Sequence, residues 1–189
     1  IYFVPTITYT PLRNGVNLIG NIVSVYNQLR NCNRNFIIKE DHIKIKDVLY
    51  SILYPFRVKK IALKNIYFNN IDLTSLFANE LKEGSFSNLS IESWINYLFI
   101  KNISNKIRIK KFINWWENQQ VDKAYNLALS KFYPKVIIEG YLGYSPRNYE
   151  LHINPIQIDS ISNTIPKSIN VISNNIKCNM SKRNKDIKF

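Results

Sequence analysis

The sequence has few glycines, few cysteines and few acidic residues, and each shortage excludes a class of protein. There are five glycines in 189 residues, and neither of the two common glycine-rich phosphate loops occurs. Cys32 and Cys178 lie far apart without metal-ligand spacing, so neither a disulfide framework nor a zinc site is indicated, and a reducing compartment is the default. The longest apolar stretch, residues 94–100, is much shorter than the roughly 20 residues that cross a bilayer.

The acidic shortage gives the chain a strong positive charge. Lysine and arginine outnumber aspartate and glutamate by 26 to 13, a formal net charge of +13. The basic residues are spread along the whole chain among Asn and Ile and match no RNA-recognition, zinc-finger or helix-turn-helix pattern. An anionic membrane surface or a phosphorylated small molecule suits this charge at least as well as nucleic acid does. Nucleic-acid binding therefore rests on charge alone.

The most informative stretch of the sequence is 111–143, which predicts a strand, a helix and a second strand. The first strand covers 111–116, and Glu117 and Asn118 mark a helix start. Pro134 ends the helix, and 136–138 form the next apolar run before Gly140. Two strands joined by a helix imply a parallel pair. The helix carries an apolar stripe at Val121, Tyr125, Ala128 and Phe132.

Alternating strands and helices along the rest of the chain predict an α/β fold. We expect a Rossmann-like open sheet, mostly parallel, with helices on both faces. A mixed segment covers 66–89, and a basic tail follows the last predicted strand. The predicted strands are 1–4, 36–39, 58–63 and 168–172, and the predicted helices are 17–29, 46–54 (ended by Pro55) and 90–102.

The ends of the sequence suggest a longer protein. No signal peptide opens the chain, and Ile1 already stands inside a strand-like run. The last strand, 168–172, precedes a tail without an apolar partner of its own. We therefore expect a domain at 1–160, and at 161–189 a linker with the first strand of a truncated second domain.

The 111–143 stretch also resembles a known family. The run NWWENQQVDK at 114–123, the Tyr133-Pro134 pair and IEGYLG at 138–143 resemble bacterial capsule and O-antigen biosynthesis proteins, two-domain glycosyltransferases of the GT-B type. In that family an aromatic–Glu–Asn–Gln segment opens a helix, a Gly-Tyr-Gln-Gly turn follows the next strand, and a proline-led strand begins the second domain. The proline at 166 matches this last feature, whereas Leu142 replaces the glutamine of the turn, so any substrate contact by that amide is absent here.

The resemblance implies that this chain is the N-terminal, acceptor-side half of a GT-B architecture. The donor would be a nucleotide-sugar bound mainly by the missing C-terminal domain, so no cofactor is expected here and the piece alone would be inactive. The acceptor would be a glycan or a lipid-linked precursor. The implied location is the cytoplasm, with peripheral contact at the anionic inner membrane face.

Candidate site residues lie where the first strand of the 111–143 unit ends, because ligands bind at the carboxyl ends of parallel strands. Glu117 is the candidate base or ligand for the acceptor hydroxyl, unless it only supports the helix N-terminus, worth roughly 0.3–1 kcal/mol. Asn118 and Gln119 could bind sugar hydroxyls, and Asn118 could instead be the helix cap. Asp122 could face the cleft or pair with a surface lysine, Lys111 or Lys123.

Further candidates flank this corner. Of the adjacent Trp115 and Trp116, one would pack in the core and the other could form the floor of a sugar site, unless both pack in the core; Trp116 is the candidate for substrate binding. Gly140 and Gly143 would permit a tight turn or close approach of a ligand. His152 follows the glycine turn in a polar, aromatic loop, as a weaker substrate-binding candidate.

Three functions remain open from the sequence. The first is a glycosyltransferase-like domain for surface polysaccharide synthesis. The second is a non-catalytic α/β module that binds carbohydrate or nucleotide. The third is a nucleic-acid-binding protein, which predicts steeply salt-dependent binding of oligonucleotides.

Overall fold

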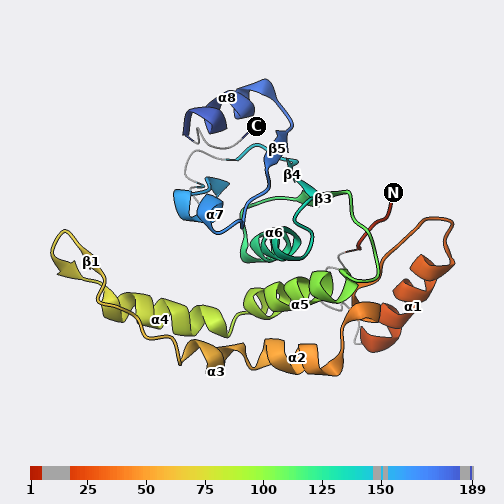
Figure 1. Cartoon of the computed structure of the whole chain (residues 1–189), viewed down its shortest axis with the longest axis horizontal. Coiled ribbons are helices and arrows are strands. Elements are labelled where there is room, and N and C mark those ends of the chain that lie inside the picture. Colours follow the sequence, from red (N-terminus) through yellow and green to blue (C-terminus); the bar gives the residue numbers. More distant parts are fainter. Residues whose placement is uncertain (6–17, 147–149, 151–152, 184–187, 189) are drawn as a thin grey trace. The chain divides into compact units, whose positions relative to one another are not determined.

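The computed structural model describes residues 1–5, 18–146, 150, 153–183 and 188. The chain divides into two compact units, residues 1–43 (unit 1) and 44–189 (unit 2). The fold is mixed α/β, as predicted. In the described part it has eight α-helices, a parallel three-stranded sheet and an antiparallel hairpin (Figure 1).

Unit 1 consists of a helix between two short extended segments. The helix α1 covers Leu18–Asn31, close to the predicted 17–29, and the 3-10 helix η1 covers Lys39–His42. The predicted strands 1–4 and 36–39 are reduced to one parallel bridge between Phe3 and Phe36, whose rings lie 5.9 Å apart. Arg30 forms an ion pair with Asp41, which joins the end of α1 to η1.

The sheet of unit 2 is parallel, as the 111–143 pattern predicts. Its strands are β3 (Lys111–Trp115), β4 (Ile137–Leu142) and β5 (Ser168–Val171), in the order β3-β4-β5. Asn114 is opposite Gly140, which in turn is opposite Ile169. The helix α6 (Gln120–Phe132) connects β3 to β4, and the short α7 (Gln157–Ile161) lies between β4 and β5.

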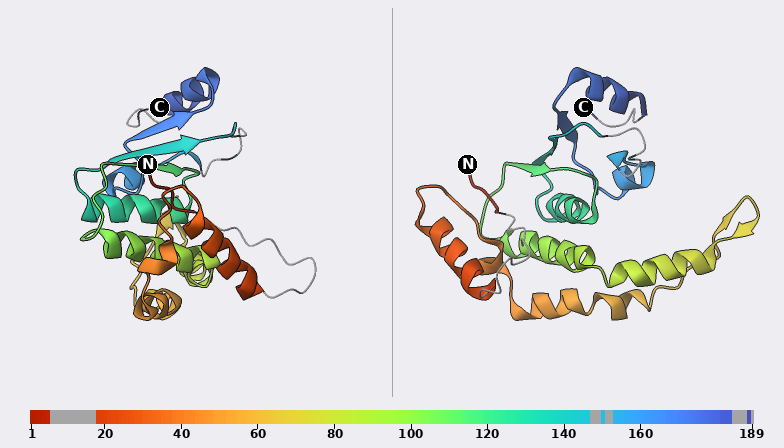
Figure 2. Two further views of the ribbon diagram at one scale, coloured as in Figure 1. Left: turned by 90° about the vertical axis from the view of Figure 1, so that its right-hand side faces the viewer. Right: turned by 180° about the vertical axis from the view of Figure 1, so that it is seen from behind.

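Further helices of unit 2 extend the helical layer away from the sheet (Figures 1 and 2). The helix α5 (Asn88–Ile103) packs on α6 with one side and on α2 (Ile45–Ile52) with another. Then α3 (Tyr54–Val58) packs against α4 (Thr74–Ser85). Between them, β1 (Tyr67–Phe68) and β2 (Ile71–Asp72) form a hairpin through Asn69 and Asn70, whose φ angles of 49° and 66° suit such a two-residue turn.

Among the described residues, helices cover one face of the sheet and the other face is exposed, so the prediction of helices on both faces is not met. Along β4 the buried positions 138, 140 and 142 alternate with 137 and 141, which are 52% and 42% exposed. Figure 1 shows α6 and α7 on the same side of the strands. The helix α8 (Asn174–Arg183) adds Ile176 and Met180 to the core on the covered face. That core consists of Trp116, Leu142, Ile153, Ile169, Ile176 and Met180.

Several local predictions are wrong. Pro55 lies in the first turn of α3 instead of only ending the preceding helix, because the N–H groups of a first turn have no partner within the helix. The predicted strand 58–63 contains no strand. The basic tail forms α8 and buries two apolar side chains. The strand at 168–171 is hydrogen-bonded to β4 in the same sheet, and the division between the two compact units lies after residue 43, whereas the predicted domain bounds of 1–160 and 161–189 stay a prediction.

Among the described residues, no helix combines the length and the apolar character needed to span a bilayer.

Candidate functional site

The carboxyl end of β3 leads into α6 through a tightly fixed loop, the corner at residues 116–119. The Asp122 carboxylate accepts hydrogen bonds from the backbone N–H groups of Glu117 (2.8 Å) and Gln119 (3.2 Å). Asn118 has φ 58°, in the left-handed region that asparagine tolerates better than most residues. Gln119, not Asn118, is the N-cap residue of α6. The corner therefore has a defined backbone conformation before any ligand arrives.

Asp122 stabilises this corner and does not pair with a lysine at the surface. Its side chain is buried, and burial raises its pKa, although the two N–H groups oppose the shift and the neighbouring Glu117 charge adds to it. Lys111 pairs instead with Glu139, and Lys123 with Asp159, each at 2.8 Å. The expected surface pairing of Asp122 is thus wrong, because its carboxylate points back to the helix start.

Glu117 is held between two side chains of the same corner. Its Oε1 accepts a hydrogen bond from Trp115 Nε1 and its Oε2 accepts one from Gln119 Nε2, both at 2.7 Å. A carboxylate has about four lone-pair sites, so each oxygen keeps acceptor capacity for a further donor. Glu117 can therefore receive a ligand hydroxyl in a fixed orientation. Its catalytic role, and sugar binding by Asn118 and Gln119, stay predictions.

The tryptophan that ends β3, Trp115, and the next residue, Trp116, differ in exposure. Trp116 is fully buried in the core and offers no surface to a ligand. Trp115 is 54% exposed and packs edge-on against Tyr141 with centroids 5.7 Å apart. The alternation was expected, but Trp115, not Trp116, presents the indole beside Glu117. The choice of Trp116 as a substrate contact is corrected by its burial.

Gly140 and Gly143 make room for these tryptophans. Gly140 lies within β4, and a Cβ there would come within 3.0 Å of Trp116 Cβ and Pro166 Cγ. A Cβ on Gly143 would overlap the Trp115 ring. Neither glycine has a φ in the left-handed region, so the need for glycine at these positions comes from the neighbouring side chains and not from the backbone conformation. Their function in this structure is close packing against an indole ring.

Tyr144 follows β4 by two residues, and its phenol is influenced electrostatically by Glu150 as well as by the corner; the sequence pattern pointed to neither residue. Burial raises the pKa of the Tyr144 phenol, and the charges of Glu117, Glu150 and Asp122 raise it further. The corner is thus locally acidic in a strongly basic chain. Clustering of acidic residues at 117, 122 and 150 was the available signal, but it requires the fold to be seen. His152 lies outside the described residues.

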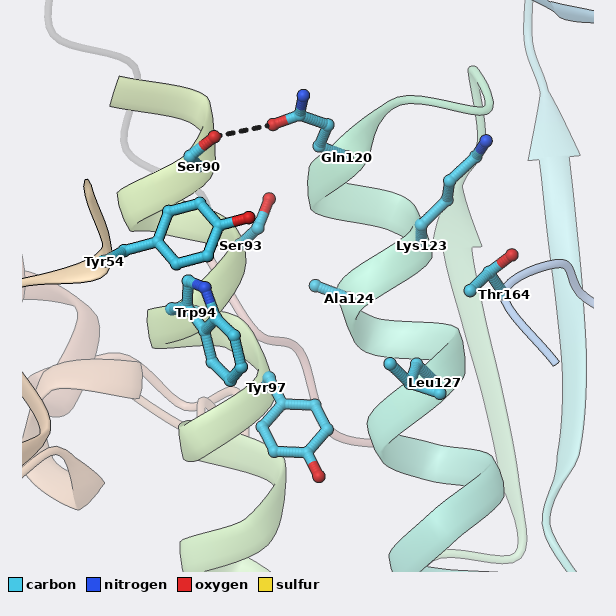
Figure 3. Close-up of a pocket in the computed structure, with 10 residues that line it drawn as sticks. All are labelled: Tyr54, Ser90, Ser93, Trp94, Tyr97, Gln120, Lys123, Ala124, Leu127 and Thr164. Atoms are coloured by element: carbon cyan, nitrogen blue, oxygen red, sulfur yellow. Dashed lines mark hydrogen bonds between the residues drawn. The ribbon is translucent and has the colours of Figure 1, made fainter. Parts of the chain in front are cut away.

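A separate pocket of about 340 Å³ lies between α5 and α6 (Figure 3). Trp94 is 5.7 Å from both Tyr54 and Tyr97, measured between ring centroids, and these three rings form one wall. At one end Ser90 Oγ donates a hydrogen bond of 3.1 Å to Gln120 Oε1. The pocket is lined by Tyr54, Ser90, Ser93, Trp94, Tyr97, Gln120, Lys123, Ala124, Leu127 and Thr164.

This pocket and the corner meet at the N-terminus of α6. Gln120 lines the pocket and directly follows Gln119, whereas Glu117 is not a lining residue. Apolar and aromatic walls with a few polar groups are typical of small-molecule sites. The sequence could not single out these aromatic residues, because Trp94 and Tyr97 show the spacing of a helix face packed in a core.

Within the described part of the chain, no group of three or more His, Cys, Asp or Glu side chains is placed to hold a metal ion. No protein-family model, no curated protein and no solved structure matches this chain.

Proposed function

We propose that this chain is the acceptor-side, Rossmann-like domain of a GT-B-type glycosyltransferase for surface polysaccharide synthesis. The support comes from the 111–143 motif, from the parallel β3-α6-β4 unit, and from the position of Glu117 at the carboxyl end of β3. The donor nucleotide-sugar would bind in another domain of the protein, as the resemblance implies. The acceptor would be a glycan or lipid-linked sugar.

The observation that carries the proposal is the Trp115–Glu117 pair. An exposed indole face can stack against the C–H face of a sugar ring, while a carboxylate beside it accepts hydrogen bonds from hydroxyls. The 2.7 Å hydrogen bond between Trp115 Nε1 and Glu117 Oε1 fixes the two groups relative to each other. A sugar hydroxyl resting on the free lone pair of Glu117 would be placed for proton removal as it attacks the anomeric carbon.

Binding is tested by calorimetric titration of the chain with methyl glucoside, methyl galactoside and N-acetylglucosamine. We expect Trp115→Ala to weaken binding of the preferred sugar by about tenfold or more, because the stacking surface is lost. Ile113→Ala is the matched control, since Ile113 is also exposed on β3 and contributes no hydrogen bond partner to Glu117. If both variants lose sugar affinity equally, or if Trp115→Ala loses none, the proposed sugar site is wrong.

Catalysis is tested in the intact protein that contains these residues. We expect Glu117→Gln to reduce sugar transfer by about a hundredfold or more, because the base is lost. Acceptor binding and thermal stability should change little, because Gln keeps the shape and one acceptor for Trp115. Unchanged transfer would remove Glu117 from the reaction and leave only a binding role.

The second candidate is a non-catalytic module that binds carbohydrate or nucleotide in the aromatic pocket. Its support is the absence of a carboxylate among the described residues lining that pocket, beside three aromatic rings. Ala124→Phe would fill the space between α5 and α6. Loss of UMP, AMP or sugar binding in Ala124→Phe, with no change in Trp115→Ala, would favour this module over the transferase.

A further inference from the structure

The outer side of α2 and α3 carries an exposed apolar stripe, defined here as Ile45, Leu49, Ile52 and Phe56. Their spacing of four, three and four residues places them along one side of the helical segment. Their side chains are 80%, 54%, 50% and 59% exposed, respectively. Contiguous exposed apolar side chains of this kind mark a surface that binds something.

The stripe is not a loosely packed core face, because the opposite side of the same helices is engaged. Asp47 Oδ2 accepts a 2.8 Å hydrogen bond from Asn102 Nδ2 of α5. Tyr50 packs edge-on against Trp94 of α5 with centroids 5.3 Å apart, and Ser51 is fully buried. Figures 1 and 2 show α2 and α3 as the layer beyond α5, on the side away from α6. The stripe therefore lies on the outer surface of unit 2.

The charge beside the stripe is of one sign. Residues 44–64 contain six basic residues and a single acidic residue, Asp47. Asp47 is buried and accepts hydrogen bonds from the Lys44 backbone N–H and from Asn102, and with this carboxylate counted the segment still has five more basic than acidic residues. The lysines of this segment are all exposed, and they are Lys44, Lys46, Lys59, Lys60 and Lys64.

We propose that the apolar stripe docks on the surface of an anionic lipid bilayer. Helices that lie in the membrane interface combine an apolar side with lysines that attract anionic headgroups, and this segment has both. The stripe is about 17 Å long at 1.5 Å per residue, which suits lying along a surface and not crossing it. A protein partner would need a complementary acidic rim, whereas a bilayer supplies negative charge around the whole stripe. This inference does not depend on the sugar-binding proposal.

The test is co-sedimentation of the 189-residue chain with vesicles. We expect binding to vesicles of phosphatidylcholine mixed with phosphatidylglycerol, and about tenfold weaker binding to phosphatidylcholine alone. Leu49→Ser with Phe56→Ser should reduce binding to the mixed vesicles by about tenfold. Leu76→Ser with Phe77→Ser, which alters exposed apolar residues of α4, is the matched control and should bind normally.

Circular dichroism melting of each variant separates lost docking from lost folding. A third variant, Lys59→Glu with Lys60→Glu, removes positive charge and leaves the apolar side chains unchanged. It should weaken binding to the mixed vesicles. Absence of binding to those vesicles, or equal binding by the stripe variant and its control, overturns the proposal. Concentration-dependent dimerisation that Leu49→Ser with Phe56→Ser abolishes would assign the stripe to a second copy and also overturn it.

Discussion

Arg57 shows how single residues of this chain are held by aromatic faces in place of ion pairs. Its guanidinium carbon lies 3.6 Å from the Tyr50 ring centroid, 5.2 Å from that of Trp94 and 5.6 Å from that of Tyr54. Nη1 donates to the Tyr50 carbonyl, and Nη2 is buried without a hydrogen-bond partner among the described residues. The cation–π contacts therefore provide much of the compensation for burying this charge.

Replacing Arg57 should test that compensation. We expect Arg57→Met to lower the free energy of unfolding by about 1–2 kcal/mol, because contacts with three rings are lost. Arg57→Lys should recover little of this, because an ammonium group lacks the planar surface that stacks on rings. Lys59→Met, two residues further along the chain and exposed, should stay within about 0.5 kcal/mol of the wild type in urea denaturation. A fully stable Arg57→Lys variant would contradict the stacking account.

Asp122 makes the stability of the helix start depend on pH. Burial raises its folded pKa above the ordinary 3.8, so the folded state retains the proton to higher pH than the unfolded chain. Its contribution to stability is therefore greatest below pH 3.8 and is lost as the pH rises through the folded pKa. Asp122→Asn should remove this dependence, as urea denaturation at several pH values would show.

Asp122→Ala should have a larger effect at neutral pH, by leaving the Glu117 and Gln119 N–H groups without their acceptor. We expect a loss of about 1 kcal/mol relative to Asp122→Asn, in line with other helix caps. Equal stability of the two variants at pH 7 would show that water replaces the side-chain acceptor of the two N–H groups at no cost.

At the scale of elements, β4 depends on a glycine for its packing. A Cβ at Gly140 would press on Trp116 and Pro166, whereas a Cβ at Gly84 in α4 would meet nothing within 4 Å. We expect Gly140→Ala to destabilise the chain by about 1–3 kcal/mol through overpacking. Gly84→Ala should stabilise it by about 0.5–1 kcal/mol by favouring the helix. Thermal melts of the two variants would check these opposite signs.

The pairing of Lys123 with Asp159 joins α6 to α7. Burial alone would raise the pKa of Asp159, but the hydrogen bond from Lys123, the Ile156 N–H and the lysine charge together lower it. Its stabilising contribution is therefore present above pH 3.8 and is lost as the pH falls through the lowered folded pKa. Asp159→Asn should reduce the loss of stability at acidic pH, as shown by the urea concentration at the midpoint of unfolding, measured from neutral to acidic pH. An unchanged pH profile would show that the Lys123–Asp159 ion pair contributes nothing to stability.

The sequence predicted elements best where periodicity and breakers agreed. The β3-α6-β4 unit was predictable because the apolar stripe has helical spacing and Pro134 marks the end of the helix. The α8 helix was missed because Ile176 and Met180 are the buried apolar residues among mostly polar neighbours. At the site, the chain order placed Glu117 at a strand end. Alternation showed that one tryptophan faces outward, but which one depends on the packing of the strand against α6.

At the scale of the whole molecule, positive charge exceeds negative charge by a wide margin, although the corner around Glu117 is locally acidic. There are 26 basic and 13 acidic residues, so even if every acidic residue were paired as Glu139 is with Lys111, half of the basic residues would have no acidic partner. Self-repulsion of this kind weakens the folded state and is screened over a Debye length of about 10 Å at 0.1 M salt. We expect the melting temperature to rise by a few degrees between low salt and about 0.3 M sodium chloride. A lower melting temperature at the higher salt concentration would show that favourable ion pairs outweigh the repulsion between like charges.

The absence of a side chain at Gly143 has a consequence for tryptophan fluorescence. Because no Cβ occupies that position, the Trp115 ring lies over the chain there and stays more than half exposed, while Trp116 is sealed and Trp94 is half-buried. Emission at the long-wavelength edge, quenched by acrylamide, should therefore come mainly from Trp115. Trp115 is therefore an intrinsic fluorophore beside Glu117, and a ligand that binds at that corner should shift its emission to shorter wavelength.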